Sequence, residues 1–148
     1  MYSWFEMLAV DTDAKLFAAA DRPIALVAED DRDARALLVE LLDEAGFQAT
    51  GAPNGQEALG LLRNGLRPSV IVLDLMMPVM DGWDFRMNQL RDPALQNIPV
   101  VLVTAAGFSE DTIRRQLHGV EMVRKPPRAV EILRAVERAI SAPRSGNG

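Results

Sequence analysis

The side chains of this sequence that are best suited to chemistry are a few carboxylates, one hydroxyl and one lysine, each next to a short apolar run. They are Glu29, Asp30, Asp31, Asp74, Thr104 and Lys125. Carboxylate oxygens are hard ligands that favour Mg²⁺, which keeps several waters and often binds a phosphate oxygen as well. A lysine adds positive charge beside such a phosphate. If the fold brings these residues together, they predict a site for Mg²⁺ and a phosphoryl group.

Asp74 is the candidate nucleophile of this predicted site. Neighbouring carboxylates raise one another's pKa, and a bound cation offsets that repulsion, so Asp74 stays ionised and can attack phosphorus. In-line phosphoryl transfer needs mainly positioning and charge neutralisation, which Lys125 and the metal would supply. Thr104 can donate a hydrogen bond to a phosphoryl oxygen, and the small side chain of Ala105 leaves room for the group. The sequence has no glycine-rich phosphate loop, so a nucleotide is not an obvious donor.

Short apolar runs alternate with longer amphipathic stretches from Pro23 onward, which predicts strands alternating with helices around a parallel sheet. The expected strands are residues 24–29, 47–52, 70–74, 99–104 and 120–124, and the expected helices are residues 31–45, 54–64, 83–91, 109–117 and 128–140. With right-handed crossovers this pattern gives a doubly wound α/β sheet. Functional sites of such sheets lie outside the carboxyl ends of the strands, where the candidate residues fall.

Two of the expected helices show a core-facing stripe in their apolar spacing. In the first helix the stripe contains Ala34, Leu37, Leu38, Leu41 and Leu42. In the last helix it contains Val130, Leu133, Val136 or Glu137, and Ile140. We expect one domain over residues 23–141. Residues 1–22 are interpreted as an N-terminal extension with a nearly helical period, and residues 142–148 as a disordered tail.

Composition limits the classes of protein to which the chain can belong. Its 148 residues, 49% of them hydrophobic, supply one core. A net charge of −5 argues against direct binding of nucleic acid, and the lack of cysteine excludes disulfides and thiolate metal sites. No apolar run is long enough to cross a membrane and no signal peptide is evident, so we expect a cytoplasmic location. Because Lys15 lies in the extension, Lys125 is the only lysine of the expected domain.

Four motifs together resemble the receiver domains of bacterial response regulators, in particular single-domain regulators of the chemotaxis type. The motifs are EDD at residues 29–31, DLMMPVMDG at 74–82, VTA at 103–105 and KP at 125–126. The combination is specific and covers roughly residues 23–141. The resemblance implies a flavodoxin-like (βα)5 sandwich whose parallel strands follow the order 2-1-3-4-5.

The resemblance also implies which residues bind the metal and which accepts the phosphoryl group. Asp74 would be the phosphoacceptor. Asp30, Asp74 and the backbone carbonyl of Met76 would bind Mg²⁺, and Glu29 would reach the metal through a water molecule. The cofactor of the domain would therefore be Mg²⁺ alone.

The residues at the last two strands would respond to the phosphoryl group. Lys125 would bind it, Thr104 would move towards it on activation, and the bond between Lys125 and Pro126 would be cis. Two positions depart from the family pattern. Met122 lies where the family commonly has a Tyr or Phe coupled to the threonine, and Pro127 replaces a frequent Phe. We therefore expect activation to be unconventional.

These features predict a stand-alone receiver rather than an enzyme with an external substrate. A sensor histidine kinase or phosphotransfer protein would phosphorylate Asp74, and the face formed by the fourth helix, fifth strand and fifth helix would change its affinity for a protein effector. One alternative is a pseudo-receiver that binds its partner independently of phosphorylation, which Met122 and Pro127 keep open. Another is a hydrolase with an aspartyl nucleophile, which Met76 disfavours because it takes the place of a second aspartate.

Overall fold

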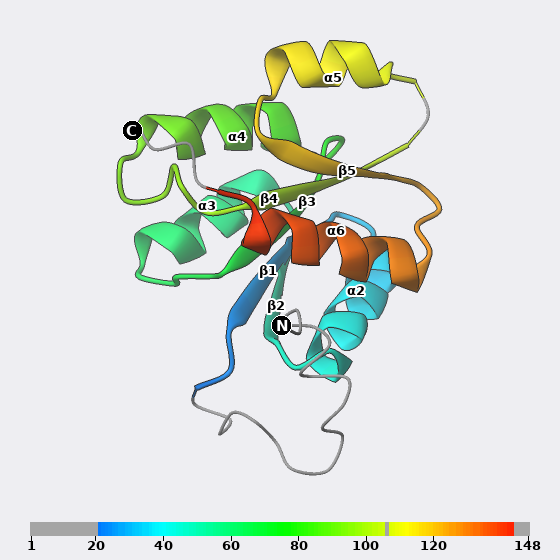
Figure 1. Ribbon diagram of the computed structural model, residues 1–148. Helices are drawn as coiled ribbons and strands as arrows, with labels where there is room; N and C mark the ends of the chain where they lie inside the picture. Colours follow the sequence, from blue (N-terminus) through cyan, green and yellow to red (C-terminus); the bar gives the residue numbers. More distant parts are fainter. Residues whose placement is uncertain (1–20, 106, 144–148) are drawn as a thin grey trace.

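The part of the chain that the computed structural model describes, residues 21–105 and 107–143, alternates strand and helix five times (Figure 1). The strands are β1 (Ile24–Ala28), β2 (Gln48–Ala52), β3 (Val70–Asp74), β4 (Val100–Thr104) and β5 (Val120–Arg124). The helices are α2 (Arg32–Glu44), α3 (Gly55–Arg63), α4 (Gly82–Arg91), α5 (Glu110–Gln116) and α6 (Ala129–Ser141). All strand pairs are parallel, in the order β2-β1-β3-β4-β5. The predicted doubly wound fold and its strand order are confirmed.

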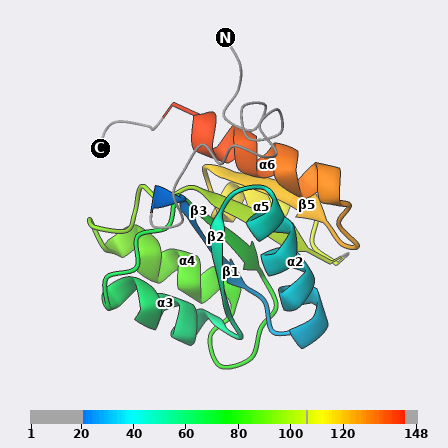
Figure 2. The same ribbon diagram turned by 90° about the horizontal axis from the view of Figure 1, so that it is seen from below.

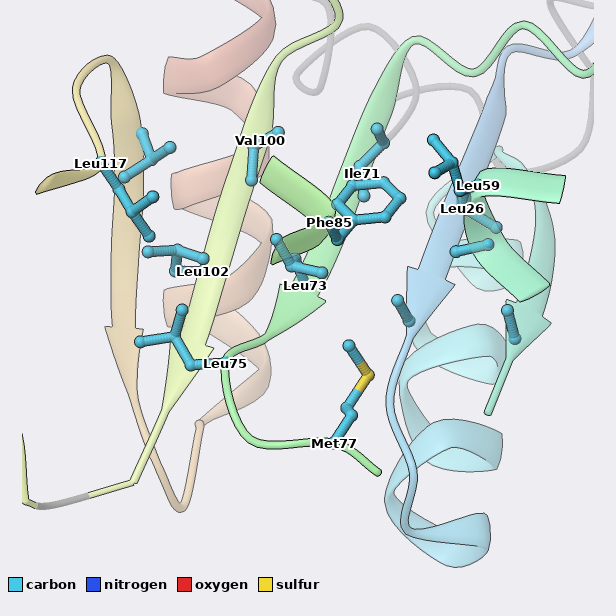
Figure 3. Packing of buried hydrophobic residues seen from close by; sticks show 14 of the residues in the cluster. Leu26, Leu59, Ile71, Leu73, Leu75, Met77, Phe85, Val100, Leu102 and Leu117 are labelled. Atoms are coloured by element: carbon cyan, nitrogen blue, oxygen red, sulfur yellow. The ribbon is translucent and has the colours of Figure 1, made fainter. Parts of the chain in front are cut away.

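Successive residues of a strand point to opposite sides of the sheet, so the apolar strands give the sheet two faces to bury. Different helices cover these two faces. Figure 2 shows α2 and α6 on one face and α3 and α4 on the other. The first face is closed by Leu38, Leu42, Ile132, Ala135 and Val136, which pack on the valines of β3 and β4. The second contains Leu59, Phe85 and Ile113 from α3, α4 and α5, and Figure 3 shows Phe85 against the sheet. β3 and β4 are buried along their whole length, as their continuous apolar runs predict.

The helices begin at side-chain caps close to the strand ends. Asp31, Asn54, Asp81 and Ser109 each accept a hydrogen bond from the backbone N–H three residues further on. These caps fix where α2, α3, α4 and α5 begin. The loops that follow β1, β3 and β4 are therefore held at both ends, whereas at the start of α6 the backbone N–H of Arg128 donates to the side chain of Glu131.

The expected bounds of strands and helices agree with the structure to within two residues, but the two predicted stripes are partly wrong. Leu37 is 67% exposed, and α2 buries only Leu38 and Leu42. Val130 is 42% exposed, whereas the expected Val136 is buried and Leu133 and Ile140 pack partly buried against the core; α6 also buries Ile132 and Ala135, which the predicted stripe left out. Each helix touches the sheet along a narrow line, so the flank of its apolar stripe remains open to solvent.

The predicted N-terminal extension and C-terminal tail fall largely on residues 1–20 and 144–148, which lie outside the described residues. Those two expectations therefore stay predictions. Among the helices that the structure describes, none combines the length and the apolar character needed to cross a membrane.

Candidate functional site

The carboxyl ends of four strands bring the predicted site residues to one edge of the sheet. Glu29 directly follows β1, Asp74 and Thr104 are the last residues of β3 and β4, and Lys125 directly follows β5. In the parallel register Asp74 pairs with Val103, one residue before Thr104, so the ends of the two central strands lie level. The fold thus makes neighbours of residues that are far apart in the sequence.

Three carboxylates form a cluster at this edge. Glu29 is 1% exposed and Asp74 5% exposed, whereas Asp30 faces solvent. One oxygen atom from each of the three lies within 4.8 Å of the others. Negative charges at this separation repel one another, and a cation is needed to offset the repulsion. The donor set, hard oxygen atoms that are partly buried and partly open to water, fits Mg²⁺.

Lys125 supplies a positive charge to the buried carboxylates. Its Nζ atom lies 2.8 Å from Oε1 of Glu29 and donates a hydrogen bond to Oδ2 of Asp74 at 3.2 Å. Burial alone would lower the pKa of Lys125, but attraction to Glu29 and Asp74 outweighs it and raises the pKa above its usual value. The backbone N–H of Lys125 donates to the carbonyl of Thr104, and the bond to Pro126 is cis, as the family resemblance implied.

The loop after β1 is held by its own backbone and by Arg35, which the sequence reasoning missed. The N–H of Asp31 donates to Oε2 of Glu29 at 3.1 Å, so this carboxylate is fixed at both oxygens. Nη1 of Arg35 donates to the carbonyls of Glu29 at 2.9 Å and of Asp30 at 3.4 Å. A signal was present in the sequence, because Arg35 lies one helical turn after the capping residue Asp31.

Two glycines allow helices to pack closely against the loop that follows Asp74. The N–H of Gly82 donates to the carbonyl of Leu75, and a Cβ atom at Gly82 would lie 2.5 Å from the carbonyl oxygen of Asp74. The N–H of Gly55 at the start of α3 donates to the carbonyl of Met80. At the head of the loop, the N–H of Met76 donates to Oδ1 of Asp74 at 3.2 Å. Both carboxylate oxygens of Asp74 therefore accept a hydrogen bond, Oδ1 from Met76 and Oδ2 from Lys125, and these bonds orient the side chain.

Val79 occupies a strained position in the same loop. Its φ angle is +70°, in the left-handed region that β-branched residues rarely adopt. The N–H of Met80 donates to the carbonyl of Pro78 at 2.8 Å, which closes a tight turn of three residues around Val79. The side chain is 75% exposed, so little packing compensates for the strain.

Replacement of Val79 by asparagine is expected to raise the free energy of unfolding by about 1 kcal/mol, because asparagine tolerates the left-handed region and valine does not. Urea denaturation measures the difference. Val130→Asn is the matched control, since Val130 is also exposed but lies in the first turn of α6. Equal stability of Val79→Asn and wild type would contradict the inferred strain.

Thr104 and Met122 each have a different environment from Asp74 in this structure. The hydroxyl of Thr104, which is 2% exposed, donates to the carbonyl of Ala105 at 3.2 Å. No hydrogen bond joins Thr104 to Asp74 in the part of the chain that the structure describes. Met122 is half-buried against the core cluster that contains Leu102. Ala105 is exposed beside the site and leaves space there.

The family model of the response regulator receiver domain matches residues 25–137, a range that includes the whole carboxylate cluster and all five strands except Ile24, the first residue of β1. The chain belongs to this family. Receiver domains are signalling domains of two-component systems, so the class predicted from the motifs is confirmed.

Individual relatives agree with this assignment. The protein Rrf1 of Nitratidesulfovibrio vulgaris is 35% identical over 116 residues, which cover 78% of this chain and 81% of Rrf1. The receiver domain of a signal transduction histidine kinase from Syntrophus aciditrophicus has a TM-score of 0.72 and 32% identity, covering 80% of this chain and 90% of that one.

A receiver domain of a sensor histidine kinase from Pseudomonas aeruginosa shares the fold, with a TM-score of 0.71 and 22% identity over 80% of this chain and 98% of that one. That protein has a magnesium ion coordinated in its active-site cleft. Receiver domains of this family bind Mg²⁺ in an acidic site, and the present receiver has an acidic cluster of the same kind at its strand ends.

Proposed function

We propose that this receiver accepts a phosphoryl group on Asp74 in the presence of Mg²⁺ and so switches its affinity for a protein partner in the cytoplasm. The observation that carries the proposal is the placement of Asp74. Its buried carboxylate lies within the three-carboxylate cluster, with one oxygen bonded to the N–H of Met76 and the other to Lys125. A carboxylate at the end of a buried strand is costly unless it has such partners.

Asp74, Asp30 and the backbone carbonyl of Met76 would hold the metal, with Glu29 reaching it through water. When bound, Mg²⁺ supplies positive charge to the carboxylates and to the phosphoryl oxygens. A carboxylate oxygen of Asp74 forms a bond to phosphorus while the P–N bond of a phosphohistidine donor breaks. The electron pair of that bond stays on the imidazole, which then takes a proton.

The remaining site residues would stabilise the transferred group. Lys125 exchanges part of its contact with Glu29 for a phosphoryl oxygen, and its raised pKa keeps the ammonium charged throughout the neutral range. The hydroxyl of Thr104 leaves the carbonyl of Ala105 and donates to another phosphoryl oxygen. The small, exposed side chain of Ala105 leaves room for this movement. These steps place charge and hydrogen bonds around the group without a further catalytic residue.

A groove beside Lys125 supports a protein, such as a sensor histidine kinase or phosphotransfer protein, as the donor. It has a volume of about 780 Å³ and lies between α2 and the segment that joins β5 to α6. Its lining includes Leu37, Leu41, Pro127 and Ile132, and it adjoins Glu29 at the site. An apolar groove that reaches the site at Glu29 and Lys125 suits a helix that presents a histidine. The partner that responds would bind the face of α5, β5 and α6.

Intact mass spectrometry after incubation with acetyl phosphate and Mg²⁺ tests the proposal. We expect one phosphoryl adduct on wild type that hydroxylamine removes, and none on Asp74→Asn or in the presence of EDTA. Asp111→Asn, at an exposed position in the first turn of α5, is the matched control and should be labelled like wild type. A folded protein that forms no adduct with either acetyl phosphate or phosphohistidine donors would contradict phosphoryl transfer.

Met76 should lengthen the lifetime of this adduct. Its side chain is 57% exposed two residues after Asp74, where it can shield the acyl phosphate from water. We expect Met76→Asn to shorten the lifetime about tenfold, because a polar side chain positions water instead of excluding it. Loss of the adduct over time, followed by mass spectrometry, gives the rate. A lifetime that is unchanged or longer in Met76→Asn would contradict this role.

A pseudo-receiver is the second candidate function, and one observation favours it. Met122 lacks the ring that commonly couples to this threonine in the family. The hydroxyl of Thr104 donates its hydrogen bond to the carbonyl of Ala105 and not to Asp74. In that case the domain would bind its partner equally well before and after phosphorylation. Partner affinity measured on wild type and Asp74→Asn, each with and without the phosphodonor, separates the two functions.

A further inference from the structure

Helix α4 buries two polar side chains beside Phe85 and leaves two large apolar side chains exposed, a departure from the usual arrangement. Arg86 is 5% exposed and Gln89 is fully buried. On the outer side, Met87 is 45% exposed and Leu90 40% exposed. Trp83 lies one turn before Met87 and is half-buried; one part of it packs against the core cluster, with its ring 5.7 Å from that of Phe108 at an interplanar angle of 73°, and the rest continues the exposed row of Met87 and Leu90. Trp83, Met87 and Leu90 form what we call the outer stripe.

The buried polar pair fixes the rotation of α4 about its own axis. Arg86 donates to Oε1 of Gln89 at 2.8 Å and to the carbonyl of His118 at 3.0 Å. Gln89 in turn donates to the carbonyls of Leu95 and Ile98, both at 3.0 Å. These bonds tie α4 to the loop before β4 and to the turn before β5. The outer stripe is therefore held outward and cannot roll into the core.

Burial of this guanidinium is unfavourable by itself. No carboxylate lies within ion-pair distance of Arg86 among the residues that the structure describes, and its Nε atom has no hydrogen-bond partner there. Burial lowers the pKa of Arg86 for the same reason. The bonds that Arg86 and Gln89 donate to the carbonyls of His118, Leu95 and Ile98 offset part of this cost. The same arrangement leaves Met87 and Leu90 exposed on the outer side of α4.

Two charged residues flank the outer stripe and have no ion-pair partner within the described ranges. They are Asp84 near the start of α4 and Arg91 at its end. They are seven positions apart, close to two helical turns, so they lie on the same side of the helix and about 10.5 Å apart along its axis. A second α4 in antiparallel orientation would place its Arg91 opposite Asp84 and its Asp84 opposite Arg91. The pattern is complementary to itself about a twofold axis, as an isologous interface requires.

We propose that the outer stripe of α4 is the contact between two copies of this chain, with the α4 helices antiparallel and two reciprocal Asp84–Arg91 ion pairs. Met87 lies at the twofold axis against its counterpart, and Trp83 and Leu90 flank it. The contact is small, so the dimer is weak, with a dissociation constant on the order of 100 µM to 1 mM. It is independent of the carboxylate cluster and needs neither metal nor phosphoryl group.

Charge reversal tests the proposal on the full chain by sedimentation equilibrium in EDTA at low ionic strength. We expect concentration-dependent dimers of wild type. Asp84→Arg alone, or Arg91→Asp alone, places like charges opposite each other twice and should weaken association about tenfold or more. The doubly reversed chain restores both ion pairs and should associate like wild type. An equimolar mixture of the two singly reversed chains should form heterodimers, because each supplies the charge that the other lacks.

Changes in the stability of α4 cannot explain a loss of association in the singly reversed chains and its recovery in the doubly reversed chain. An arginine near the start of α4 and an aspartate at its end both oppose the helix dipole, so the doubly reversed chain has the least stable helix and yet should recover association. Circular dichroism confirms that each variant is folded. Met87→Glu should prevent association in every background. Wild type that stays monomeric up to millimolar concentration, or dimers that the charge reversals leave unchanged, would overturn the proposal.

Discussion

Gly82→Ala is expected to lower the free energy of unfolding by about 3 kcal/mol and to displace Asp74. A Cβ atom at this position would lie 2.5 Å from the carbonyl oxygen of Asp74 and 2.8 Å from Cα of Leu75. Both atoms belong to the backbone of the buried strand end, so neither can turn aside as a flexible side chain would. The start of α4 must move away, and the hydrogen bond from Gly82 to Leu75 is lost.

Urea denaturation of wild type and Gly82→Ala measures this loss, and amide NMR spectra report whether Leu75 and Met76 shift. Gly60→Ala is the matched control. Gly60 lies inside α3, and a Cβ atom there meets nothing within 4 Å. We expect Gly60→Ala to stabilise the protein by about 0.5–1 kcal/mol, because alanine favours helix more than glycine. A Gly82→Ala protein as stable as wild type would show that the loop is not packed as described.

Lys125→Met is the second substitution with a large expected effect. It leaves Glu29 and Asp74, which are 1% and 5% exposed, facing each other without the ammonium that lies 2.8 Å and 3.2 Å from them. Removal of one partner from a buried ion pair costs about 3–5 kcal/mol. The side chain of Lys125 is 28% exposed, so water screens part of the charge and we expect a loss of about 2 kcal/mol at neutral pH.

The pH dependence follows from the direction of the pKa shift. The pKa of Lys125 is raised in the folded state. Its contribution to stability is therefore complete below the unfolded pKa of about 10.4 and is lost only as the pH rises through the folded value.

Thermal denaturation across pH, with and without Mg²⁺, measures these effects. Mg²⁺ should stabilise Lys125→Met more than it stabilises wild type, because the variant has lost the ammonium that contacts Glu29 and Asp74. Asp74→Asn in the Lys125→Met background is the control, since it removes one of the two opposed charges and should recover more than half of the loss. If Lys125→Met were as stable as wild type at neutral pH, the ion pairs would not contribute to folding.

Most of the fold could be predicted because the apolar pattern of the strands is unambiguous. Continuous apolar runs identify β3 and β4, and the position of Asp74 and Thr104 at their ends follows from the rule for parallel sheets. Leu37 and Val130 were misplaced because helical spacing defines an apolar face but not which part of it touches the sheet. That choice depends on where the two helices lie on the sheet, which spacing does not contain.

The site could be predicted less completely, because some of its residues act through backbone atoms that the sequence pattern does not reveal. Lys125 and the carboxylates stand out by type, so their convergence could be inferred from the sequence. Gly82 and Arg35 act through backbone atoms, one by leaving space and the other by donating to carbonyls. The burial of Arg86 and Gln89 in α4 was also missed, because arginine and glutamine are mostly found at protein surfaces. Only the structure distinguishes Met87 outside from Arg86 inside.

The polar pair inside α4 also restricts how this protein can evolve. A mutation of Gln89 to an apolar residue leaves the Arg86 guanidinium with one bond fewer in the core, and a mutation of Arg86 leaves Oε1 of Gln89 without its donor. Each single change therefore loses stability, and a double apolar change also leaves the carbonyls of His118, Leu95 and Ile98 without these donors. Positions 86 and 89 should therefore be inherited together as a polar pair.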